Sequence, residues 1–155
     1  MTAVNLESEY RAHAADLVRY ATVLVGPFDA ADVVSEAVSA TMARTSLATV
    51  DDVRAYWFRA VSNTAASWHR SAFRRRDREQ RAAAIAQPEE GHHTPTDARA
   101  ILSSLSVQQR AVVYLTYWHD WTPDQIAQVL GVSDGTVRKQ LARSRAHLRE
   151  VLPHD

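Results

Sequence analysis

Apolar side chains recur at steps of three and four residues along most of the chain, which is the period of an amphipathic helix. The pattern predicts helices over about residues 5–25, 29–44 and 53–81. Gly26 and Pro27 should end the first of them, because neither residue continues a helix well. Glycine (4 residues) and proline (5 residues) are scarce in the whole chain, so composition also favours an all-α fold.

Two of these helices carry an apolar face that we expect to point inward. On the second helix this face consists of Val33, Val34, Ala37, Val38 and Thr41. On the third helix it consists of Val53, Trp57, Ala60, Val61, Thr64 and Trp68. We therefore expect the two tryptophans to be core residues rather than platforms for nucleic-acid bases.

Residues 83–97 contain two prolines, one glycine and polar residues, and they are predicted to form a flexible linker. They separate two predicted small helical domains, residues 1–82 and residues 98–152. At ~3.3 Å per residue the linker can span roughly 50 Å when fully extended. His92 and His93 lie within it, but the chain has no cysteine and no spaced carboxylate partners beside them. We therefore expect neither a metal ion nor any other cofactor.

The second predicted domain begins with a short helix over residues 97–105, followed by a helix over residues 106–118. Ser106 and Gln109 have the spacing of a capping box, which starts the second of these helices. Four aromatic residues lie on this helix or just after it, and we expect them to wedge it against the next segment. They are Tyr114, Tyr117, Trp118 and Trp121.

The segment Thr122–Leu141, TPDQIAQVLGVSDGTVRKQL, has the pattern of a helix-turn-helix. Thr122 and Gln125 form a second capping box, and Gly131 suits the left-handed turn that ends a helix. Ser133 is then the expected N-cap of the second helix. The buried face of that helix is predicted to be Val137, Leu141 and Leu148.

The other faces of this last helix carry basic residues, namely Arg138, Lys139, Arg143, Arg145 and Arg149. An apolar-backed helix with a basic front, held across a tight turn, is suited to enter the major groove of DNA. Short helices around a glycine also occur in bundles that bind nothing. The row of basic residues favours DNA binding over that simpler interpretation.

The formal net charge is zero, but the charges are distributed in blocks. Residues 1–53 carry 8 acidic and 3 basic side chains, whereas residues 54–86 carry 2 acidic and 8 basic ones. Residues 87–132 carry 5 acidic and 2 basic side chains, and residues 133–155 carry 3 and 5. Two basic blocks predict two nucleic-acid surfaces, and the acidic blocks predict at least one surface for another partner.

Two polar rows lie on the helices of the first predicted domain. Asp29, Asp32 and Glu36 form an acidic row on the second helix, although acids near a helix start also suit the helix dipole. The third helix carries a polar and basic stripe made of Arg59, Asn63, Ala66, Arg70 and Arg74. Guanidinium groups suit phosphates and amides suit exposed bases, so the stripe is a candidate site for a nucleic-acid strand. Its simpler interpretation is a solvated helix end.

No apolar run approaches the length of a membrane span, and the N-terminus has no signal-peptide pattern. We therefore expect a cytoplasmic protein without membrane insertion. No constellation of serine, tyrosine or carboxylate side chains has catalytic spacing, which argues against an enzyme that acts on nucleic acid.

Three segments follow one another in the chain: DAADVVSEA, DVRAYWFRAVSNTAASWHR and LSVQQRAVVYLTYWHDWTPDQIAQVLGVSDGTVRKQLARSRAHLR. Together they resemble the extracytoplasmic-function (ECF, or group IV) sigma factors, the small two-domain sigma subunits of bacterial RNA polymerase. The resemblance covers about residues 5–82 and 97–152, and GTVRKQLARSRAHLR is its most specific part. It implies a region 2-like helical domain at residues 1–82 and a region 4-like helix-turn-helix domain at residues 98–152.

By position, the resemblance implies three binding surfaces. The helix that docks on the clamp coiled coil of core RNA polymerase corresponds to Asp29, Asp32, Val33 and Glu36. Capture of the melted −10 strand corresponds to Tyr56, Arg59, Asn63, Ser67, Arg70 and Arg74, and the loop at residues 45–52 lies where the family holds a flipped base. Reading of the −35 duplex corresponds to Ser133, Asp134, Thr136, Arg138, Lys139, Arg143 and Arg145. The implied partners are core polymerase, through its clamp and flap, and promoter DNA, with an anti-sigma protein as a further candidate.

Several positions differ from the residues common in that family. Ser35 replaces a glutamine and Val38 an aromatic residue, both of which bear on affinity for core polymerase. Ser67 replaces an aspartate, which bears on the −10 preference, and Val107 replaces a proline. Asp134 carries a charge that phosphate repels, so we expect it to cap its helix or to accept a hydrogen bond from a cytosine amine.

A second function is also compatible with the residues. A stand-alone helix-turn-helix regulator would bind DNA with its second domain and would sense a signal or dimerise with its first. Such a regulator binds duplex DNA tightly on its own, whereas a sigma factor needs core polymerase.

Overall fold

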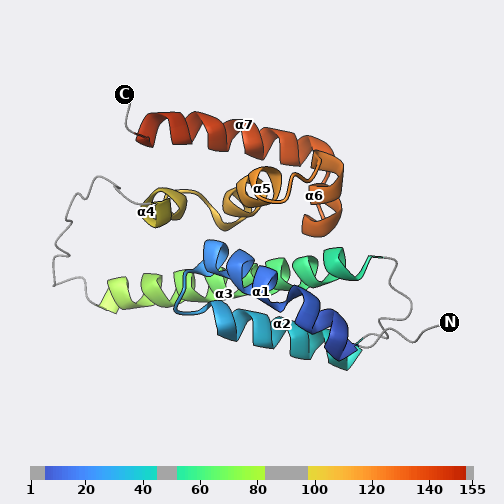
Figure 1. Ribbon diagram of the computed structural model, residues 1–155. Coiled ribbons are helices and arrows are strands. Elements are labelled where there is room, and N and C mark those ends of the chain that lie inside the picture. The colour runs from blue at the N-terminus through green and yellow to red at the C-terminus, as the bar shows by residue number, and fades with distance from the viewer. Residues whose placement is uncertain (1–5, 45–51, 83–97, 153–155) are drawn as a thin grey trace.

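The computed structural model describes residues 6–44, 52–82 and 98–152 of the chain. These residues form seven helices and no strand, which confirms the all-α prediction. The helices are α1 (Leu6–Val25), α2 (Ala30–Arg44), α3 (Val53–Ala82), α4 (Ala98–Ser103), α5 (Val107–Tyr117), α6 (Pro123–Leu130) and α7 (Asp134–Val151). Figure 1 shows them in two layers, with α1–α3 in one layer and α4–α7 in the other.

Several helix starts follow from local hydrogen bonds that the sequence signals. The Asp52 carboxylate accepts from the N–H of Ala55 at 3.0 Å at the start of α3. The hydroxyls of Ser106 and Thr122 each accept from the N–H of the glutamine three residues on, whose side chain bonds back. Both predicted capping boxes are therefore confirmed. They satisfy N–H groups that have no partner within the helix, and so they define where α5 and α6 begin.

The first layer is a bundle in which α1, α2 and α3 all pack against one another. Its fully buried side chains include Leu17, Tyr20, Val33, Trp57 and Val61. Full burial of a large apolar side chain stabilises the fold by roughly 1.5–3 kcal/mol. The core position predicted for Trp57 is confirmed, whereas Trp68 is only half-buried at the surface of the bundle.

The second layer packs α5 and α6 against α7. Leu115 of α5, Ile126 of α6 and Val137 of α7 have no exposed surface. Leu141 is also buried, as its spacing predicts, whereas Leu148 near the end of α7 is half-buried.

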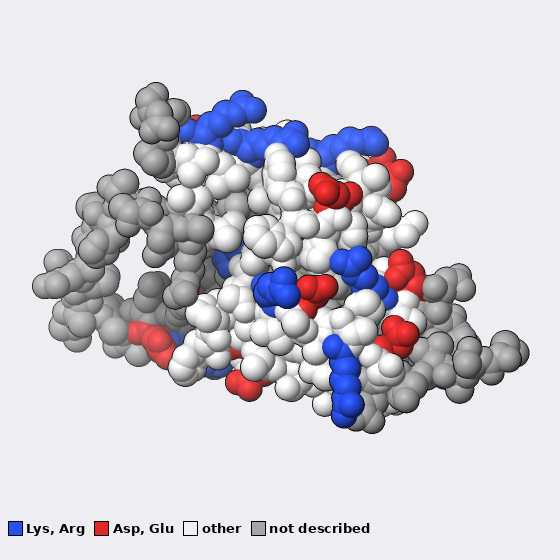
Figure 2. Space-filling view, viewed as in Figure 1, with Lys and Arg blue, Asp and Glu red and all other residues white. Residues whose placement is uncertain are grey.

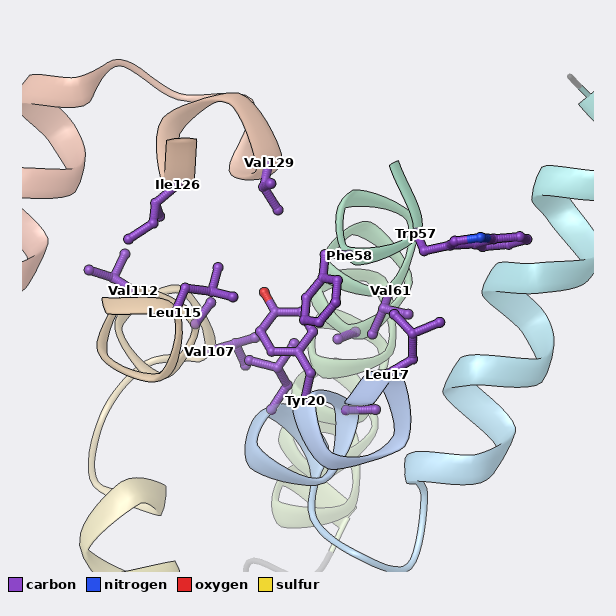
Figure 3. Packing of buried hydrophobic residues seen from close by; sticks show 14 of the residues in the cluster. Leu17, Tyr20, Trp57, Phe58, Val61, Val107, Val112, Leu115, Ile126 and Val129 are labelled. Atoms are coloured by element: carbon purple, nitrogen blue, oxygen red, sulfur yellow. The ribbon is translucent and has the colours of Figure 1, made fainter. Parts of the chain in front are cut away.

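The two layers share one hydrophobic core, because α1 and α3 pack against α5 and α6. The ring of Tyr20 lies 5.7 Å from that of Tyr114, and the ring of Phe58 lies 5.3 Å from that of Trp121. Figure 3 shows Tyr20 and Phe58 directed toward α5 and α6, whereas Trp57 points away from them. Phe58 is absent from the apolar face predicted for its helix, and it is buried where the two layers meet.

This packing corrects the role expected of the aromatic residues around α5. They do not act together as a wedge against the helix-turn-helix. Tyr114 and Trp121 contact the first layer instead, whereas Tyr117 and Trp118 are 56% and 68% exposed. Spacing along one segment cannot show which neighbour an aromatic side chain will meet.

The predicted linker at residues 83–97, with His92 and His93, lies outside the described residues, as does all of the predicted loop at residues 45–52 except Asp52. Within the described ranges, no helix combines the length and the apolar composition of a membrane span. The same ranges contain no cluster of three or more histidine or acidic side chains that could hold a metal ion.

Candidate nucleic-acid interface

The turn between α6 and α7 depends on Gly131. Its φ is 68°, in the left-handed region that a Cβ atom disfavours, and its N–H donates to the carbonyl of Ala127. The N–H of Val132 donates to the same carbonyl at 3.1 Å. These bonds close the tight turn that a helix-turn-helix needs.

Ser133 and Thr136 organise the start of α7. The Ser133 hydroxyl accepts from the N–H of Thr136 at 3.1 Å, and the two hydroxyl oxygens lie 2.9 Å apart. The N-cap role predicted for Ser133 is therefore confirmed. Because the hydroxyls bond to each other, both residues fix the N-terminal end of α7.

The outer face of α7 carries a row of cations along the helix. Its exposed members are Arg138, Lys139, Arg143, Arg145 and Arg149. Figure 2 shows lysine and arginine side chains lined up over α7 at the edge of the molecule. We call these five residues the α7 basic row. The structure thus presents the predicted basic front to solvent, with the apolar back of the helix buried.

Arg138 is paired with an acid of its own helix. Its guanidinium lies 3.1 Å from the carboxylate of Asp134, and the two side chains are 64% and 46% exposed. An exposed pair at this spacing stabilises a helix by only ~0.3–0.5 kcal/mol. Breaking the pair of Asp134 with Arg138 therefore costs little. Ser133, and not Asp134, supplies the side-chain cap.

Arg145 is positioned by Tyr117, in a contact that the sequence analysis did not predict. Its Nε donates to the Tyr117 hydroxyl at 2.6 Å, and its guanidinium carbon lies 5.6 Å from the centre of that ring. Both contacts restrict the guanidinium and add a cation–π attraction. The two residues lie 28 positions apart on different helices, so no spacing rule could have linked them.

The residues assigned to the −10 strand lie along one side of α3, and we call them the α3 stripe. Arg59, Asn63, Ser67, Arg70 and Arg74 are exposed, and Tyr56 is half-buried. Beside the stripe, α2 and α3 enclose a pocket of about 320 Å³. Tyr56, Arg59 and Asn63 line this pocket opposite small residues of α2. A phenol, a guanidinium and an amide are groups that can hold an unstacked base.

The other edge of the α3 stripe is formed by the helix-turn-helix. A Cβ placed on Gly131 would lie 3.8 Å from Nη2 of Arg59. A smaller pocket of about 110 Å³ is lined by Asn63 and Ala66 of α3 together with Leu130 of α6. The stripe therefore lies between α2 on one side and the α6–α7 turn on the other.

The residues assigned to polymerase docking do not all reach the surface of α2. Asp32 and Glu36 are exposed and Asp29 is half-buried, but Val33 has no exposed surface. Val33 therefore cannot touch a partner directly. This corrects its assignment to polymerase docking, because Val33 is a core residue beneath the acidic row. The Glu36 carboxylate accepts a hydrogen bond from the indole N–H of Trp68, which ties α2 to α3.

A polar contact joins the two layers near the start of α3. Nη2 of Arg54 lies 2.7 Å from Nδ1 of His119, and the guanidinium carbon lies 5.5 Å from the centre of the Trp121 ring. Arginine can only donate, so Nδ1 of a neutral His119 accepts. Burial lowers the pKa of His119, and the Arg54 charge lowers it further. The sequence analysis assigned no role to this pair, whose members lie 65 positions apart.

An exposed basic helix presented by a helix-turn-helix defines a protein that binds duplex DNA. The family model described as Sigma-70, region 4, matches residues 96–148, which include most of α7. The RNA polymerase sigma-E factor of Streptomyces coelicolor is 33% identical over 147 residues, which cover 88% of this chain and 79% of that protein. The ECF RNA polymerase sigma factor SigL of Mycobacterium tuberculosis is 32% identical over 155 residues, or 92% of this chain and 86% of that protein.

The chain therefore belongs to the extracytoplasmic-function sigma factors of bacterial RNA polymerase, and its function is promoter-specific transcription initiation. The sequence similarity covers 88% of this chain, so it extends well beyond the helix-turn-helix. A stand-alone regulator related to this family only by its DNA-binding helices would be similar over those helices alone. This alternative is therefore set aside.

Solved structures show the same fold. The sigma factor RpoE from Bartonella quintana, solved in complex with the anti-sigma factor NepR, has a TM-score of 0.70 at 21% identity, over 94% of both chains. The PhyRSL–NepR complex from Sphingomonas has a TM-score of 0.66 at 20% identity, over 98% of this chain and 96% of that one. The likeness covers both layers of helices.

Proposed function

We propose that the protein divides promoter recognition between two surfaces and holds the polymerase with a third. The helix α7 reads the −35 duplex, the α3 stripe captures the melted −10 strand, and the acidic row of α2 docks on the clamp coiled coil. In this assignment residues 1–82 form the region 2-like domain, residues 98–152 the region 4-like domain, and residues 83–97 the linker. One observation carries the proposal. The α7 basic row is exposed, and it lies on the helix that follows the turn at Gly131.

Arg138 is the residue of α7 best placed to read a base. It lies just over one turn from the start of the helix, where a recognition helix meets base edges, and arginine binds O6 and N7 of guanine together. Lys139, Arg143 and Arg145 contact phosphates and set the register of the helix. Ser133 and Thr136 hold the helix N-terminus, whose N–H groups favour a phosphate.

The pocket between α2 and α3 receives an unstacked base of the non-template strand. The Tyr56 ring and the Arg59 guanidinium offer stacking surfaces, and the Asn63 amide offers hydrogen bonds to a base edge. Arg70 and Arg74 follow the backbone of the strand. Trapping the base stabilises the open promoter, so strand separation needs no ATP and the protein performs no covalent chemistry.

Asp32 and Glu36 face basic residues of the clamp, while the region 4-like domain contacts the flap. The bond from Trp68 holds Glu36 in place for that contact. The protein acts in the cytoplasm together with the polymerase. The similar RpoE fold was solved with an anti-sigma factor, and this supports an anti-sigma protein as a further partner of this chain.

Run-off transcription with purified core polymerase and genomic DNA tests this proposal. We expect transcripts from a limited set of promoters that share −35 and −10 elements. Asp32→Arg combined with Glu36→Arg should abolish core binding and transcription, because cations replace both exposed acids. Glu79→Arg reverses another exposed acid outside the row and is the matched control. Full core binding by the double variant would place the docking face elsewhere.

A further inference from the structure

Phe28 is the most exposed large apolar side chain of the described residues, with 94% of its surface open to solvent. It lies in the turn between α1 and α2, just before Asp29, whose carbonyl accepts the first hydrogen bond of α2 from Val33 at 3.0 Å. An apolar residue in this place commonly packs on the side chain five positions on, which here is Val33. Val33 is fully buried and Phe28 is not, so this local contact is not made. The ring adds almost nothing to the stability of the free chain.

The turn holds Phe28 in a defined position. Gly26 has a φ of 90°, which a residue with a Cβ atom rarely adopts, and its N–H donates to the carbonyl of Thr22 at 2.9 Å. Pro27 follows with the fixed φ of its ring, and α2 begins at Ala30. An exposed aromatic ring on a short, fixed turn loses little freedom when a partner covers it.

A pocket of about 330 Å³ lies next to this turn, between the end of α1 and the helices α4 and α5. Figure 1 shows α4 on the same side of the molecule as the turn. Val23, Val25 and Leu102 give the pocket apolar walls, and each of them is half-buried. We call this the α1–α4 pocket, and its lining residues are Thr22, Val23, Val25, Gly26, Leu102, Ser103 and Arg110.

Arg110 gives the α1–α4 pocket a positive charge. Its Nη1 donates to the carbonyl of Leu24 at 2.6 Å and its Nε to the carbonyl of Leu105 at 3.0 Å. No carboxylate of the described residues pairs with this guanidinium, and burial lowers its pKa. A partly buried cation without an acidic partner attracts an anion that enters the pocket.

The projecting ring and the pocket are neighbours on one surface. Gly26 lines the pocket, and its Cα lies at most ~7.6 Å from that of Phe28, because two steps of ~3.8 Å separate them. A projection beside a hollow is self-complementary, since a two-fold axis places the projection of each copy in the hollow of the other. Asp29 and Asp32 lie beside the ring and Arg110 lies in the pocket, so the same axis brings opposite charges together twice.

We propose that two copies of the chain associate through this surface, with Phe28 of each copy in the α1–α4 pocket of the other. Asp29 of each copy then lies close to the guanidinium of Arg110 across the interface. A second copy is the occupant that the surface itself specifies, because both complementary parts lie side by side on it. One ring per copy makes a small interface, so the dimer is reversible, with a dissociation constant on the order of 10 μM.

Sedimentation equilibrium of the free full-length chain tests whether the dimer forms. We expect one monomer–dimer equilibrium between about 1 and about 200 μM. Phe28→Ser should weaken association at least about tenfold, because an aromatic anchor carries much of the binding energy of a small interface. A chain that stays monomeric at the highest concentration overturns the inference, as does a Phe28→Ser chain that associates like the unmodified protein.

Met42→Ser is the matched control, because Met42 is also an exposed apolar residue, 49% accessible, on the same helix. It lies 12 positions after Ala30, which is about 18 Å along α2, so its loss should change association by less than about twofold. Phe28→Ser should unfold at the same temperature as the unmodified protein, because the ring is not buried. Equal weakening in the two variants would mean general stickiness of apolar side chains and overturns the inference.

Ser103→Trp tests the pocket without touching Phe28. Ser103 is exposed and lines the α1–α4 pocket, so an indole there covers the entrance. This variant should also weaken association at least about tenfold, as expected when an anchor loses its pocket. Unchanged association with a folded Ser103→Trp chain would place the ring elsewhere and overturns the inference.

Cross-linking tests the arrangement of the two copies. The chain has no cysteine, so Ala31→Cys in one tagged chain and Ser103→Cys in another provide one exposed thiol each. A short bis-maleimide linker should join the two tagged chains in the mixture, and Phe28→Ser in both chains should abolish this product. Met42→Cys mixed with Ser103→Cys should give little of it. A yield that is equal in the two mixtures overturns the inference.

The dimer does not rest on the proposed function, and the two fail separately. Sedimentation and cross-linking use the free chain, whereas run-off transcription uses the chain bound to core polymerase. Promoter-specific transcription by a chain that stays monomeric overturns the dimer alone. A dimer that depends on Phe28, without specific transcription, overturns the proposed function alone.

Discussion

The α7 basic row and the α3 stripe both present arginine side chains to solvent, yet their surroundings differ. The row stands on the outer side of one helix, which is convex and unobstructed (Figure 2). The stripe lies between α2 and the α6–α7 turn, beside a pocket of about 320 Å³. A convex cationic helix fits the major groove of a duplex, whereas a stripe beside a pocket fits a strand whose bases have left the stack. The shape of the surrounding molecular surface, more than the residue type, distinguishes the α7 basic row from the α3 stripe.

The largest effect is expected from the core that supports the α3 stripe. Trp57→Ala removes a fully buried side chain and should lower the free energy of unfolding by ~3–5 kcal/mol. Thermal unfolding followed by circular dichroism measures this change. Trp118→Ala removes a tryptophan that is 68% exposed and should cost far less. Equal losses in the two variants would contradict the packing described for α3.

The next effect distinguishes base reading from phosphate binding within the α7 basic row. Arg138→Ala should cost ~1–3 kcal/mol on the preferred −35 sequence and much less on other duplexes, because the bidentate bond to a base is lost. Lys139→Ala should weaken binding to all duplexes alike. It should also reduce the slope of log affinity against log salt concentration by about 1, because one phosphate contact is lost. Fluorescence anisotropy of the holoenzyme on promoter and scrambled duplexes measures both. A uniform loss in Arg138→Ala would make this residue a phosphate contact.

A smaller effect is expected from the pocket beside the α3 stripe. Asn63→Ala removes hydrogen bonds to one base and should destabilise the open complex by ~0.5–1.5 kcal/mol. A fluorescent base analogue in the −10 element reports the opening. Because Asn63 is exposed and lies outside α7, duplex binding at −35 should stay unchanged. Reduced −35 binding would show that the two surfaces are not independent in the holoenzyme.

The smallest effect concerns pH. Burial and the Arg54 charge lower the pKa of His119 below its usual 6.5, so the packed state binds this proton less readily than the separated or unfolded state. Packing of the two layers is thus fully stable above pH 6.5 and weakens as the pH falls toward the lowered pKa of His119. On the facing α1, the charge of Asp16 raises this pKa and that of Arg19 lowers it. His119→Gln should flatten the pH dependence of the free energy of unfolding, and an unchanged slope would assign it to another group.

Features decided by nearby residues were predictable from the sequence. The capping bonds of Ser106 and Thr122 span three residues, and the left-handed turn at Gly131 depends on that residue alone. The start of α7 and the line of its cations follow in the same way. The sequence therefore predicted the helices and the exposed cations of α7 correctly, and the reading of duplex DNA by α7 stays a prediction.

Features decided by contacts between distant segments were not predictable. Trp57 and Phe58 are adjacent and both apolar, but they point to different sides of α3 (Figure 3). Phe58 is buried because the second layer covers it, and helical spacing carries no information about that layer. The same reason explains why the sequence did not reveal the contact of Arg54 with His119 or that of Arg145 with Tyr117.

The pairing of Asp134 with Arg138 bears on how the protein searches a chromosome. Affinity for random duplex comes from cations that release counterions from phosphates, and each such cation lengthens the stay on a wrong sequence. Because Asp134 partly neutralises the charge of Arg138, we expect the protein to leave random duplex sooner. In the proposed assignment a guanine in the −35 element replaces the carboxylate as the partner of Arg138, and we expect this to speed the search without weakening binding at the promoter.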